Sequence, residues 1–376
     1  MAKRAVCISC FNFYDHRVEL VMDQLRDRGY ECRYITGDFN HFTRERFSLR
    51  VPDGEQVHTM LYRRNVSPAR ILSHIKFTRD VFRRVETLRP DLLYVMVPPN
   101  SLSRGAAAYK KRHPQTRLIL DMYDLWPETF PSDRAKKLAA PVFALWGKMR
   151  DAGLRHADLI CTECALYRQV LGARLDGKET RVLPLCRERV TAAAEPRAPE
   201  GEALSLCYLG NVGKLVDIEA LRALIAEAAR LRPVTLHVIG VGETKESLLE
   251  AARAAGAQTV DHGIVYDVEQ RQRILDLCHF GINMMKTSVV VGLTMKSLDY
   301  FAGGLPVLNT IAGDTRAMIQ RYNAGIEVDR NDPAATARRA ALMTPEENAR
   351  MRVNAVRLFE ENYSVARVRK ILSDLE

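Results

Sequence analysis

Short apolar runs alternate along the chain with stretches in which apolar residues recur at helical spacing. The runs predict strands at residues 5–9, 32–35, 92–97, 118–121 and 159–161, and then at 205–208, 235–239, 259–260, 280–283 and 306–308. Helical spacing predicts helices at 18–27, 217–230, 271–277 and 295–302. Strands that alternate with helices indicate parallel sheets, and apolar runs without polar alternation fit strands that are buried on both faces.

Residues 184–203 interrupt this alternation because they are rich in Pro, Ala and charge and have no apolar period. We therefore expect an α/β protein with two Rossmann-like domains, an N-terminal one at 1–184 and a C-terminal one at 204–355, joined by a linker at 185–203. Residues 356–376 form a further C-terminal helix in this interpretation. The first predicted strand lacks a following GxGxxG, and the chain has no GxxxxGK[ST], which argues against simple dinucleotide binding in the first half and against P-loop chemistry.

Composition is that of a globular protein, with 47% apolar and 27% charged residues among 376. No apolar run approaches the ~20 residues that span a bilayer, so we expect a cytoplasmic protein. The eight cysteines include two CxxC pairs, Cys7 with Cys10 and Cys161 with Cys164. Zinc or redox chemistry is one interpretation of these pairs, but small buried hydrophobes are the favoured one, because the pairs lack zinc-ribbon spacing.

Positive charge is concentrated in the first half, where residues 1–185 hold 32 Lys and Arg against 21 Asp and Glu. The segment 133–155 combines basic with large apolar residues, and we expect Pro141 to divide it into two short helices. Such a segment either docks on an anionic membrane or packs its apolar face on the core. A peripheral location on the inner face of the plasma membrane follows from the first interpretation.

The most informative segment for chemistry is 281–307. Gly292 permits close approach of backbone to a ligand, and Thr294 is a good N-cap for the helix that starts at Met295. The N–H groups at the start of that helix form an anion site suited to a diphosphate, and Lys296 adds a positive charge. Asp299 is placed to accept hydrogen bonds from ribose hydroxyls. An ordinary helix with solvated Lys and Asp is the competing interpretation.

Three further loops follow predicted strands of the second half and converge on the same sheet edge, where α/β sheets bind ligands. Their candidate residues are Gly210, Asn211 and Lys214, then Gly240 and Gly242, then Gly263, Ile264 and Val265. Glycines, an amide and a lysine suit phosphate oxygens, although plain turns would use similar residues.

Residues 293–307 (LTMKSLDYFAGGLPV) resemble the helix and turn of family 4 glycosyltransferases, and 119–131 (ILDMYDLWPETFP) resemble a segment of their bacterial capsular and exopolysaccharide members. The resemblance implies the GT-B architecture, in which the parallel sheets of two Rossmann-like domains face each other across a cleft. It also implies that sugar is transferred from a nucleotide-sugar donor, with UDP favoured, with retention and without a cofactor or required metal. The acceptor would be a saccharide or a polyprenyl-linked saccharide on the N-terminal domain, and the last helix would pack back on that domain.

The resemblance assigns roles residue by residue. Asp299 matches the second acidic residue of the family's E-x7-E motif, whereas the first position holds Val291; Asn211 occupies the place of an arginine. Asp124 and Lys296 are the expected catalytic residues. Expected donor-binding residues are Gly210, Asn211, Lys214, Gly240, Gly242, Gly263, Ile264, Val265, Gly292, Leu293, Thr294, Met295, Ser297 and Asp299. Expected acceptor-binding residues are His16, Arg17 and Glu128.

Three alternatives stay open at this point. A GT-B nucleotide-sugar 2-epimerase would share the donor site but need no acceptor. An inactive nucleotide-sugar-binding protein would fit the departures at Val291 and Asn211. A nucleic-acid-binding protein could use the basic half, but its basic residues are dispersed and no nucleic-acid-reading motif is present, so we expect no nucleic-acid partner.

Overall fold

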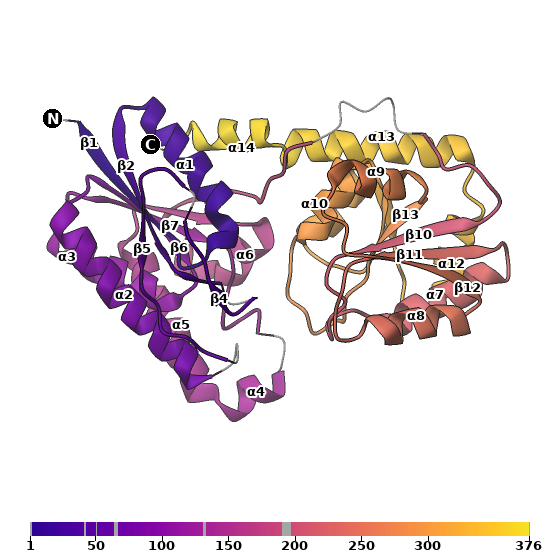
Figure 1. Ribbon diagram of the computed structural model, residues 1–376, viewed down its shortest axis with the longest axis horizontal. Helices are drawn as coiled ribbons and strands as arrows, with labels where there is room; N and C mark the ends of the chain where they lie inside the picture. Colours follow the sequence, from indigo (N-terminus) through magenta and orange to yellow (C-terminus); the bar gives the residue numbers. More distant parts are fainter. Residues whose placement is uncertain are drawn as a thin grey trace. The chain divides into compact units, whose positions relative to one another are not determined.

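The computed structural model describes residues 2–40, 43–49, 51–63, 67–130, 133–189 and 197–375. Contacts divide the chain into two compact units (Figure 1). One unit comprises Met1–Leu185 together with Arg369–Glu376, and the other comprises Cys186–Val368. Each unit is a parallel sheet covered by helices on both faces, so the expected pair of Rossmann-like domains is confirmed.

Within the described residues, the first unit has a seven-stranded parallel sheet in the order β5-β2-β1-β6-β7-β8-β9. Its strands are β1 (Lys3–Ile8), β2 (Tyr30–Gly37), β5 (Gly54–Val57), β6 (Leu92–Val97), β7 (Arg117–Met122), β8 (Leu159–Thr162) and β9 (Glu179–Val182). All six residues of β6 are buried, as expected for a central strand covered on both faces. A separate antiparallel pair is formed by β3 (Phe39–Asn40) and β4 (Glu45–Arg46).

Helices α2, α3 and α5 pack side by side on one face of this sheet, and α1 lies on the other (Figure 1). The helical elements of this unit are η1 (Asn12–Tyr14), α1 (Asp15–Asp27), α2 (Pro68–Leu88), α3 (Asn100–Arg112), α4 (Asp133–Leu138), α5 (Ala140–His156), α6 (Ala165–Leu171) and η2 (Gly172–Leu175). A Cβ at Gly153 would meet the Ser103 Oγ at 2.0 Å, so the close packing of α5 on α3 depends on that glycine.

In the described part of the second unit, six parallel strands follow the order β12-β11-β10-β13-β14-β15. These are β10 (Leu204–Leu209), β11 (Val234–Ile239), β12 (Ala257–Gly263), β13 (Phe280–Asn283), β14 (Val307–Asn309) and β15 (Gly325–Glu327). The helices are α7 (Ile218–Ala229), α8 (Lys245–Ala254), α9 (Val268–Asp276), α10 (Met295–Ala302), α11 (Asp314–Tyr322), α12 (Pro333–Ala341) and α13 (Pro345–Asn362). Helices α7, α8 and α12 cover one face, and α9, α10 and α13 cover the other (Figure 1).

The chain ends in two helices where one is expected. After α13, α14 (Val365–Leu372) begins in the second unit and ends in the first. The last residues pack on the first unit, where Leu372 and Leu375 are buried. Arg369 lies 3.3 Å from the Asp23 carboxylate on α1. The expected linker is described only in part, because residues 190–196 lie outside the described ranges.

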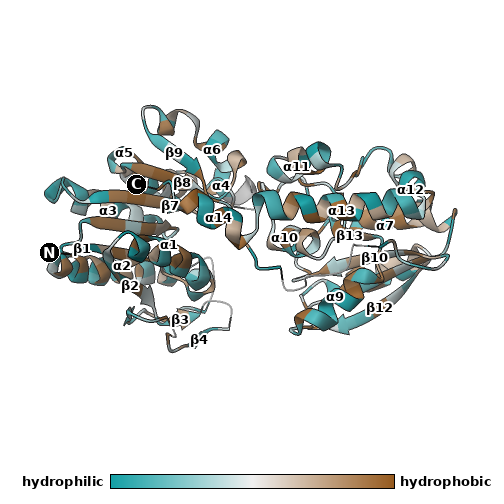
Figure 2. Ribbon diagram, turned by 90° about the horizontal axis from the view of Figure 1, so that it is seen from above, coloured by the Kyte–Doolittle hydropathy of each residue, from teal (hydrophilic) through white to brown (hydrophobic). Residues whose placement is uncertain are grey.

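Apolar residues gather in the strands, and the helices are more hydrophilic on their outer sides (Figure 2). All eight cysteines are buried, in keeping with the interpretation of both CxxC pairs as core residues. In the basic segment the helix break falls at Ala139, and Pro141 lies in the first turn of α5, which runs on for 17 residues. None of the helices in the described ranges is both long and apolar enough to cross a membrane.

Candidate functional site

The start of α10 is organised by an internal polar network. The Thr294 hydroxyl accepts a hydrogen bond from the Ser297 amide at 3.3 Å and donates one to Asn283 Oδ1 at 3.2 Å. Ser297 is fully buried and its hydroxyl bonds to Asn283 Nδ2 at 3.1 Å. The side chains of Thr294 and Ser297, both expected at the donor, therefore hold the helix to β13. The amides of Met295 and Lys296 have no hydrogen-bond partner within the described residues.

Lys296 lies beside the loop that follows β10. Its ammonium is 4.6 Å from the centre of the Tyr208 ring, and the Tyr208 hydroxyl donates to the Asn211 carbonyl at 2.9 Å. Burial lowers the pKa of the Lys296 amine to about 8, because a charged amine in a poorly hydrated place has lost the stabilisation that water gives it. An anion beside this amine would stabilise its charged form and raise its pKa again.

Two of the expected donor-binding glycines have a packing role. Gly240 has a φ of +135°, and a Cβ there would meet the Gly210 carbonyl oxygen at 2.1 Å. Gly242 has a φ of +155°, and its Cβ would meet the Val212 carbonyl oxygen at 2.3 Å. The Val212 amide donates to the Val241 carbonyl at 2.8 Å. These glycines thus allow the loops after β10 and β11 to pack backbone against backbone at the edge of the sheet. This is a different role from the direct contact with a donor that the sequence predicts for them.

The polar residues of the first loop are open to solvent. Asn211 and Lys214 are exposed, and the Lys214 amine lies 3.2 Å from the Glu243 carboxylate. Behind them, Gly292 accepts two hydrogen bonds at its carbonyl, from the Thr315 amide and hydroxyl. Leu293 is buried. Of this group, Lys214 and Asn211 have side chains that a ligand can reach.

Asp299 lines a cavity of about 310 Å³ between α9 and α10. The carboxylate lies 3.5 Å from the Arg187 guanidinium. Burial raises the pKa of Asp299, and the charges of Arg187 and Arg271 oppose that rise. Both arginines and Gln272 line the same cavity. The sequence prediction missed Arg187 because it lies just after the first unit, far from α10 in the sequence, and only folding brings the two together.

The loop after β12 presents two of the predicted residues to solvent together with an aromatic side chain that the prediction missed. Ile264 is half-exposed, Val265 is partly exposed, and Tyr266 is 85% exposed. The Gly263 amide donates to Asp261 Oδ1 at 2.8 Å, which fixes the turn. An exposed aromatic ring beside a sheet edge is suited to stacking on a planar ligand.

In the first unit, Asp124 lies in the turn after β7. Its Oδ1 accepts hydrogen bonds from the Leu125 amide at 2.7 Å and from the Thr129 hydroxyl at 2.6 Å. These contacts shape the turn. Burial raises the pKa of the Asp124 carboxyl above its usual range despite the two hydrogen bonds. A carboxyl with a raised pKa is a better proton acceptor near neutral pH than an ordinary one.

Arg17, expected at the acceptor, lies in an internal ion pair instead. It is buried on α1, with its Nε 2.6 Å and its Nη2 2.8 Å from the two oxygens of the fully buried Asp121. Its remaining N–H groups donate to the carbonyls of Leu183 and Pro184. The guanidinium therefore joins α1, β7 and the end of the unit. Its neighbour His16 is exposed in the first turn of α1.

Glu128, also expected at the acceptor, is held by Arg150 of α5. The fully buried Arg150 guanidinium forms two hydrogen bonds with the Glu128 carboxylate, one of them at 2.8 Å, and also contacts Asp151 at 2.8 Å. Arg174 lies 3.7 Å from the same carboxylate. Glu128 thereby anchors the 123–130 turn to α5.

Arg70 on α2 is a residue of this site that the sequence prediction missed. Its guanidinium carbon lies 5.6–5.9 Å from the ring centres of Phe11, Tyr62 and Trp126. Its charge opposes the rise in the pKa of Asp124. The rings come from three segments far apart in sequence, so no local pattern marks this cation.

No group of three or more His, Cys, Asp or Glu side chains in the described ranges is arranged to hold a metal ion. The positively charged groups of the chain at the candidate donor site include the Lys296 amine at the start of α10 and the Arg187 guanidinium beside Asp299.

Two family models match the chain. A "Glycosyl transferase 4-like domain" matches residues 15–187, and "Glycosyl transferases group 1" matches residues 205–343. No curated protein is significantly similar in sequence.

Solved structures of similar fold include sucrose-phosphate synthase from Thermosynechococcus elongatus, with a TM-score of 0.70, 13% identity, and 99% of this chain and 98% of that chain covered. HepE from Anabaena in complex with UDP and glucose has a TM-score of 0.65, 12% identity, and coverage of 99% and 98%. WaaG, a glycosyltransferase involved in lipopolysaccharide biosynthesis, has a TM-score of 0.66, 12% identity, and coverage of 99% for both chains. With two glycosyltransferase domains on two parallel-sheet Rossmann-like units, the chain belongs to the glycosyltransferases of the GT-B fold.

Proposed function

We propose that this glycosyltransferase moves a sugar, with retention, from a UDP-sugar bound on the second unit to a saccharide or lipid-linked saccharide bound on the first, in the synthesis of a cell-surface polysaccharide. The start of α10 carries the proposal. There, two amides without partners in the described residues lie at a helix N-terminus beside a lysine whose pKa is lowered to about 8. This arrangement suits a diphosphate. The complexes of HepE with UDP and with UDP-glucose support the choice of UDP.

Asp299 and its cavity supply the nucleoside side of the proposed donor site. Its carboxylate would accept hydrogen bonds from ribose hydroxyls, with Arg187 balancing its charge. Tyr266, exposed on the loop after β12, would stack on the base. Because Val291 takes the place of the first acidic residue of the E-x7-E motif, sugar hydroxyls would be bound by backbone groups of the neighbouring loop.

In the proposed step, the bond between the anomeric carbon and the diphosphate oxygen breaks, and its electron pair stays on that oxygen. The acceptor hydroxyl oxygen forms the new bond to the anomeric carbon, and its proton passes to a leaving phosphate oxygen. Negative charge therefore grows on the diphosphate, where the α10 amides and Lys296 stabilise it without a metal ion. Asp124 orients the acceptor hydroxyl through the carboxylate that its turn holds in place.

The first unit also offers a surface for an anionic membrane. Leu138 is 79% exposed, and Val142 and Leu145 on the first turns of α5 are exposed as well. Lys137 and Lys148 on the same two helices are exposed. Exposed apolar residues interleaved with cations favour interfacial binding over packing on the core. These residues support our proposal that the protein binds peripherally at the inner face of the plasma membrane and meets a polyprenyl-linked acceptor there.

The test replaces Lys296 by alanine and measures both donor binding and transfer. We expect turnover to fall about a hundredfold, which corresponds to ~3 kcal/mol of transition-state stabilisation, with the melting temperature unchanged. Lys111→Ala, which removes an exposed lysine from α3 of the first unit, is the matched control and should keep full activity. Equal turnover by Lys296→Ala and wild type would refute the donor site. Conversion of the UDP-sugar to an epimer without acceptor would identify a 2-epimerase instead.

A further inference from the structure

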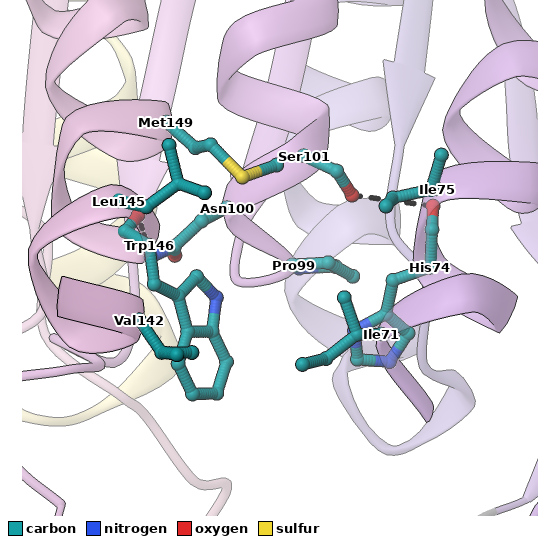
Figure 3. Close-up of a pocket in the computed structure, with 10 residues that line it drawn as sticks. All are labelled: Ile71, His74, Ile75, Pro99, Asn100, Ser101, Val142, Leu145, Trp146 and Met149. Atoms are coloured by element: carbon teal, nitrogen blue, oxygen red, sulfur yellow. Dashed lines mark hydrogen bonds between the residues drawn. The ribbon is translucent and has the colours of Figure 1, made fainter. Parts of the chain in front are cut away.

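A hollow of the second unit lies between the last turn of α12 and the first turns of α13. It measures about 550 Å³, a size typical of pockets that hold small organic molecules. Three arginines line it, Arg338, Arg339 and Arg350, together with the apolar residues Leu342 and Met343. The hollow between α2 and α5 of the first unit is smaller, about 80 Å³, and is lined mainly by aliphatic and aromatic side chains (Figure 3). The hollow of the second unit thus differs from it in both size and charge.

This hollow lies at the edge of the sheet opposite the candidate donor site. The Arg232 guanidinium, just before β11, donates a hydrogen bond to the Ala341 carbonyl at the end of α12 at 3.2 Å. On α13, Asn348 Nδ2 donates to the His279 carbonyl, just before β13, also at 3.2 Å. These contacts hold both walls of the hollow to the beginnings of strands, whereas the candidate donor loops follow the ends of strands. The hollow is therefore a separate site.

The three arginines of the hollow have no partner among the described residues. Their side chains are exposed and form no ion pair, hydrogen bond or ring contact within the described ranges. Other exposed arginines of this unit are paired, as Arg230 is with Glu227 at 2.8 Å and Arg316 with Glu327 at 3.0 Å. Guanidinium groups around one hollow repel one another, and a bound anion would offset that repulsion.

The helix dipole accounts for two of these arginines but not for the third. Arg338 and Arg339 lie in the last turn of α12, where a cation stabilises the helix. Arg350 lies in the second turn of α13, where it gains nothing from the dipole. Glu347 also lines the hollow, but its carboxylate accepts the Thr344 amide at 3.0 Å in the capping box of α13. Three guanidinium groups and one carboxylate leave two positive charges around the hollow.

We propose that this hollow binds the phosphate monoester of a small organic molecule, with the phosphate among Arg338, Arg339 and Arg350. A phosphate monoester carries a charge of about −1.5 to −2 near pH 7, which balances the two positive charges. Guanidinium groups bind phosphate oxygens through paired hydrogen bonds. The exposed Leu342 and the partly buried Met343 offer apolar surface to the organic part. This site lies outside the proposed transfer reaction and does not depend on it.

Methionine methyl groups report the occupancy of this site. Met343 and Met351 line the hollow, whereas Met295 lies at the start of α10 in the candidate donor site. In protein labelled with ¹³C at the methionine methyl groups, each of these signals is assigned by replacing that methionine with leucine. Phenyl phosphate is the probe, near neutral pH and without sugar nucleotide. We expect the Met343 and Met351 signals to shift and saturate, while the Met295 signal stays in place. A shift of Met295 alone would overturn the proposal, because the phosphate would then bind only at the donor site.

Other anions test the class of ligand. Inorganic phosphate should shift the same two signals at higher concentration, since it lacks an organic part. Benzoate, which carries one charge, should bind about tenfold more weakly than phenyl phosphate. Equal binding of benzoate and phenyl phosphate would overturn the assignment of a phosphate, and equal binding of inorganic and phenyl phosphate would overturn that of an organic ligand.

Arginine variants separate the hollow from general attraction of anions. Arg338→Gln and Arg350→Gln should each weaken binding of phenyl phosphate about tenfold, because each removes charged hydrogen bonds to the phosphate. Arg273→Gln is the matched control and should bind like wild type, since Arg273 is exposed on α9, has no partner in the described ranges and does not line the hollow. Equal weakening by all three variants would show long-range attraction in place of a site, and undiminished binding by both hollow variants would also overturn the proposal. Melting temperatures equal to that of wild type confirm that each variant is folded.

Discussion

Donor binding should depend on pH through Lys296. Burial lowers the pKa of this amine from its usual 10.5 to about 8. This shift of about 2.5 pH units corresponds to ~3 kcal/mol of lost preference for the charged form. A bound diphosphate restores that preference because it places negative charge beside the amine. The charged amine is therefore the form that binds the donor, and the neutral amine binds it more weakly.

The magnitude follows from the fraction of charged amine. With a pKa of about 8, about nine-tenths of the amine is charged at pH 7 and about one-tenth at pH 9, so the affinity for a UDP-sugar should fall about tenfold between these values. At pH 8 the complex should take up about half a proton per donor bound. Calorimetric titration in two buffers of different ionisation enthalpy measures both the affinity and the proton uptake.

Lys296→Arg is the control, because a guanidinium stays charged throughout this range. Its affinity should change little between pH 7 and 9, and any change that remains reports titration of the nucleotide itself. A wild-type affinity that is flat with pH, or one that falls equally in wild type and Lys296→Arg, would show that the amine does not contact the diphosphate.

Three further predictions concern the frame of the site. His279 accepts a hydrogen bond from the Ser205 amide, and burial lowers its pKa to about 4, so the unfolded state binds more protons below pH 6.5 and the protein loses stability as the pH is lowered. Between pH 7 and pH 4.5, the free energy of unfolding in urea should fall by about 2 kcal/mol less in His279→Asn than in wild type, and equal losses would contradict this. Gly242→Ala should cost about 2–3 kcal/mol in thermal unfolding because its Cβ would meet backbone, whereas Gly213→Ala, whose Cβ meets only the Asn211 side chain at 3.3 Å, should cost much less. Arg17→Met should destabilise the protein by about 3–5 kcal/mol because it leaves Asp121 buried without its cation, and the double variant with Asp121→Asn should recover part of that loss. If Arg17→Met instead folds normally and raises the KM for the acceptor, Arg17 belongs to the acceptor site.

The sheets could be predicted from sequence because their strands are almost wholly buried. Continuous apolar runs such as 92–97 and 280–283 coincide with β6 and β13. β12 extends over Ala257–Gly263, well beyond the two residues predicted, because it is an edge strand whose side chains are only partly buried. Among the helices, α10 was predicted to the residue because a threonine cap and a Gly-Gly stop mark its ends. The final helix was not, because Tyr363 and Ser364 carry no helix-breaking signal.

The candidate site was predicted at the level of loops, and individual side chains were harder to assign. A glycine after a strand has the same appearance in sequence whether it contacts a phosphate or another loop. The difference arises only when Gly240 and Gly242 are placed against the β10 loop. Arg187 and Arg70 were missed for the converse reason, since their neighbours Asp299 and Trp126 are distant in the chain.

The ion pair of Arg17 was marked in the sequence by its partner, Asp121. Asp121 ends an apolar run in a central strand, where burial of an unpaired carboxylate costs several kcal/mol, so a buried cation must lie within reach. β1 and β7 flank β6, and α1 is the first α-helix after β1, separated from it by η1 and a short loop, so a cation near the start of α1 is the nearest candidate. Arg17 is that cation, and the Tyr94 hydroxyl on β6 completes the carboxylate's hydrogen bonds. Because a buried charge needs a partner, Arg17 is better explained by its pairing with Asp121 than by binding a ligand. In the same turn, the exposed His16 is the residue that an acceptor can reach.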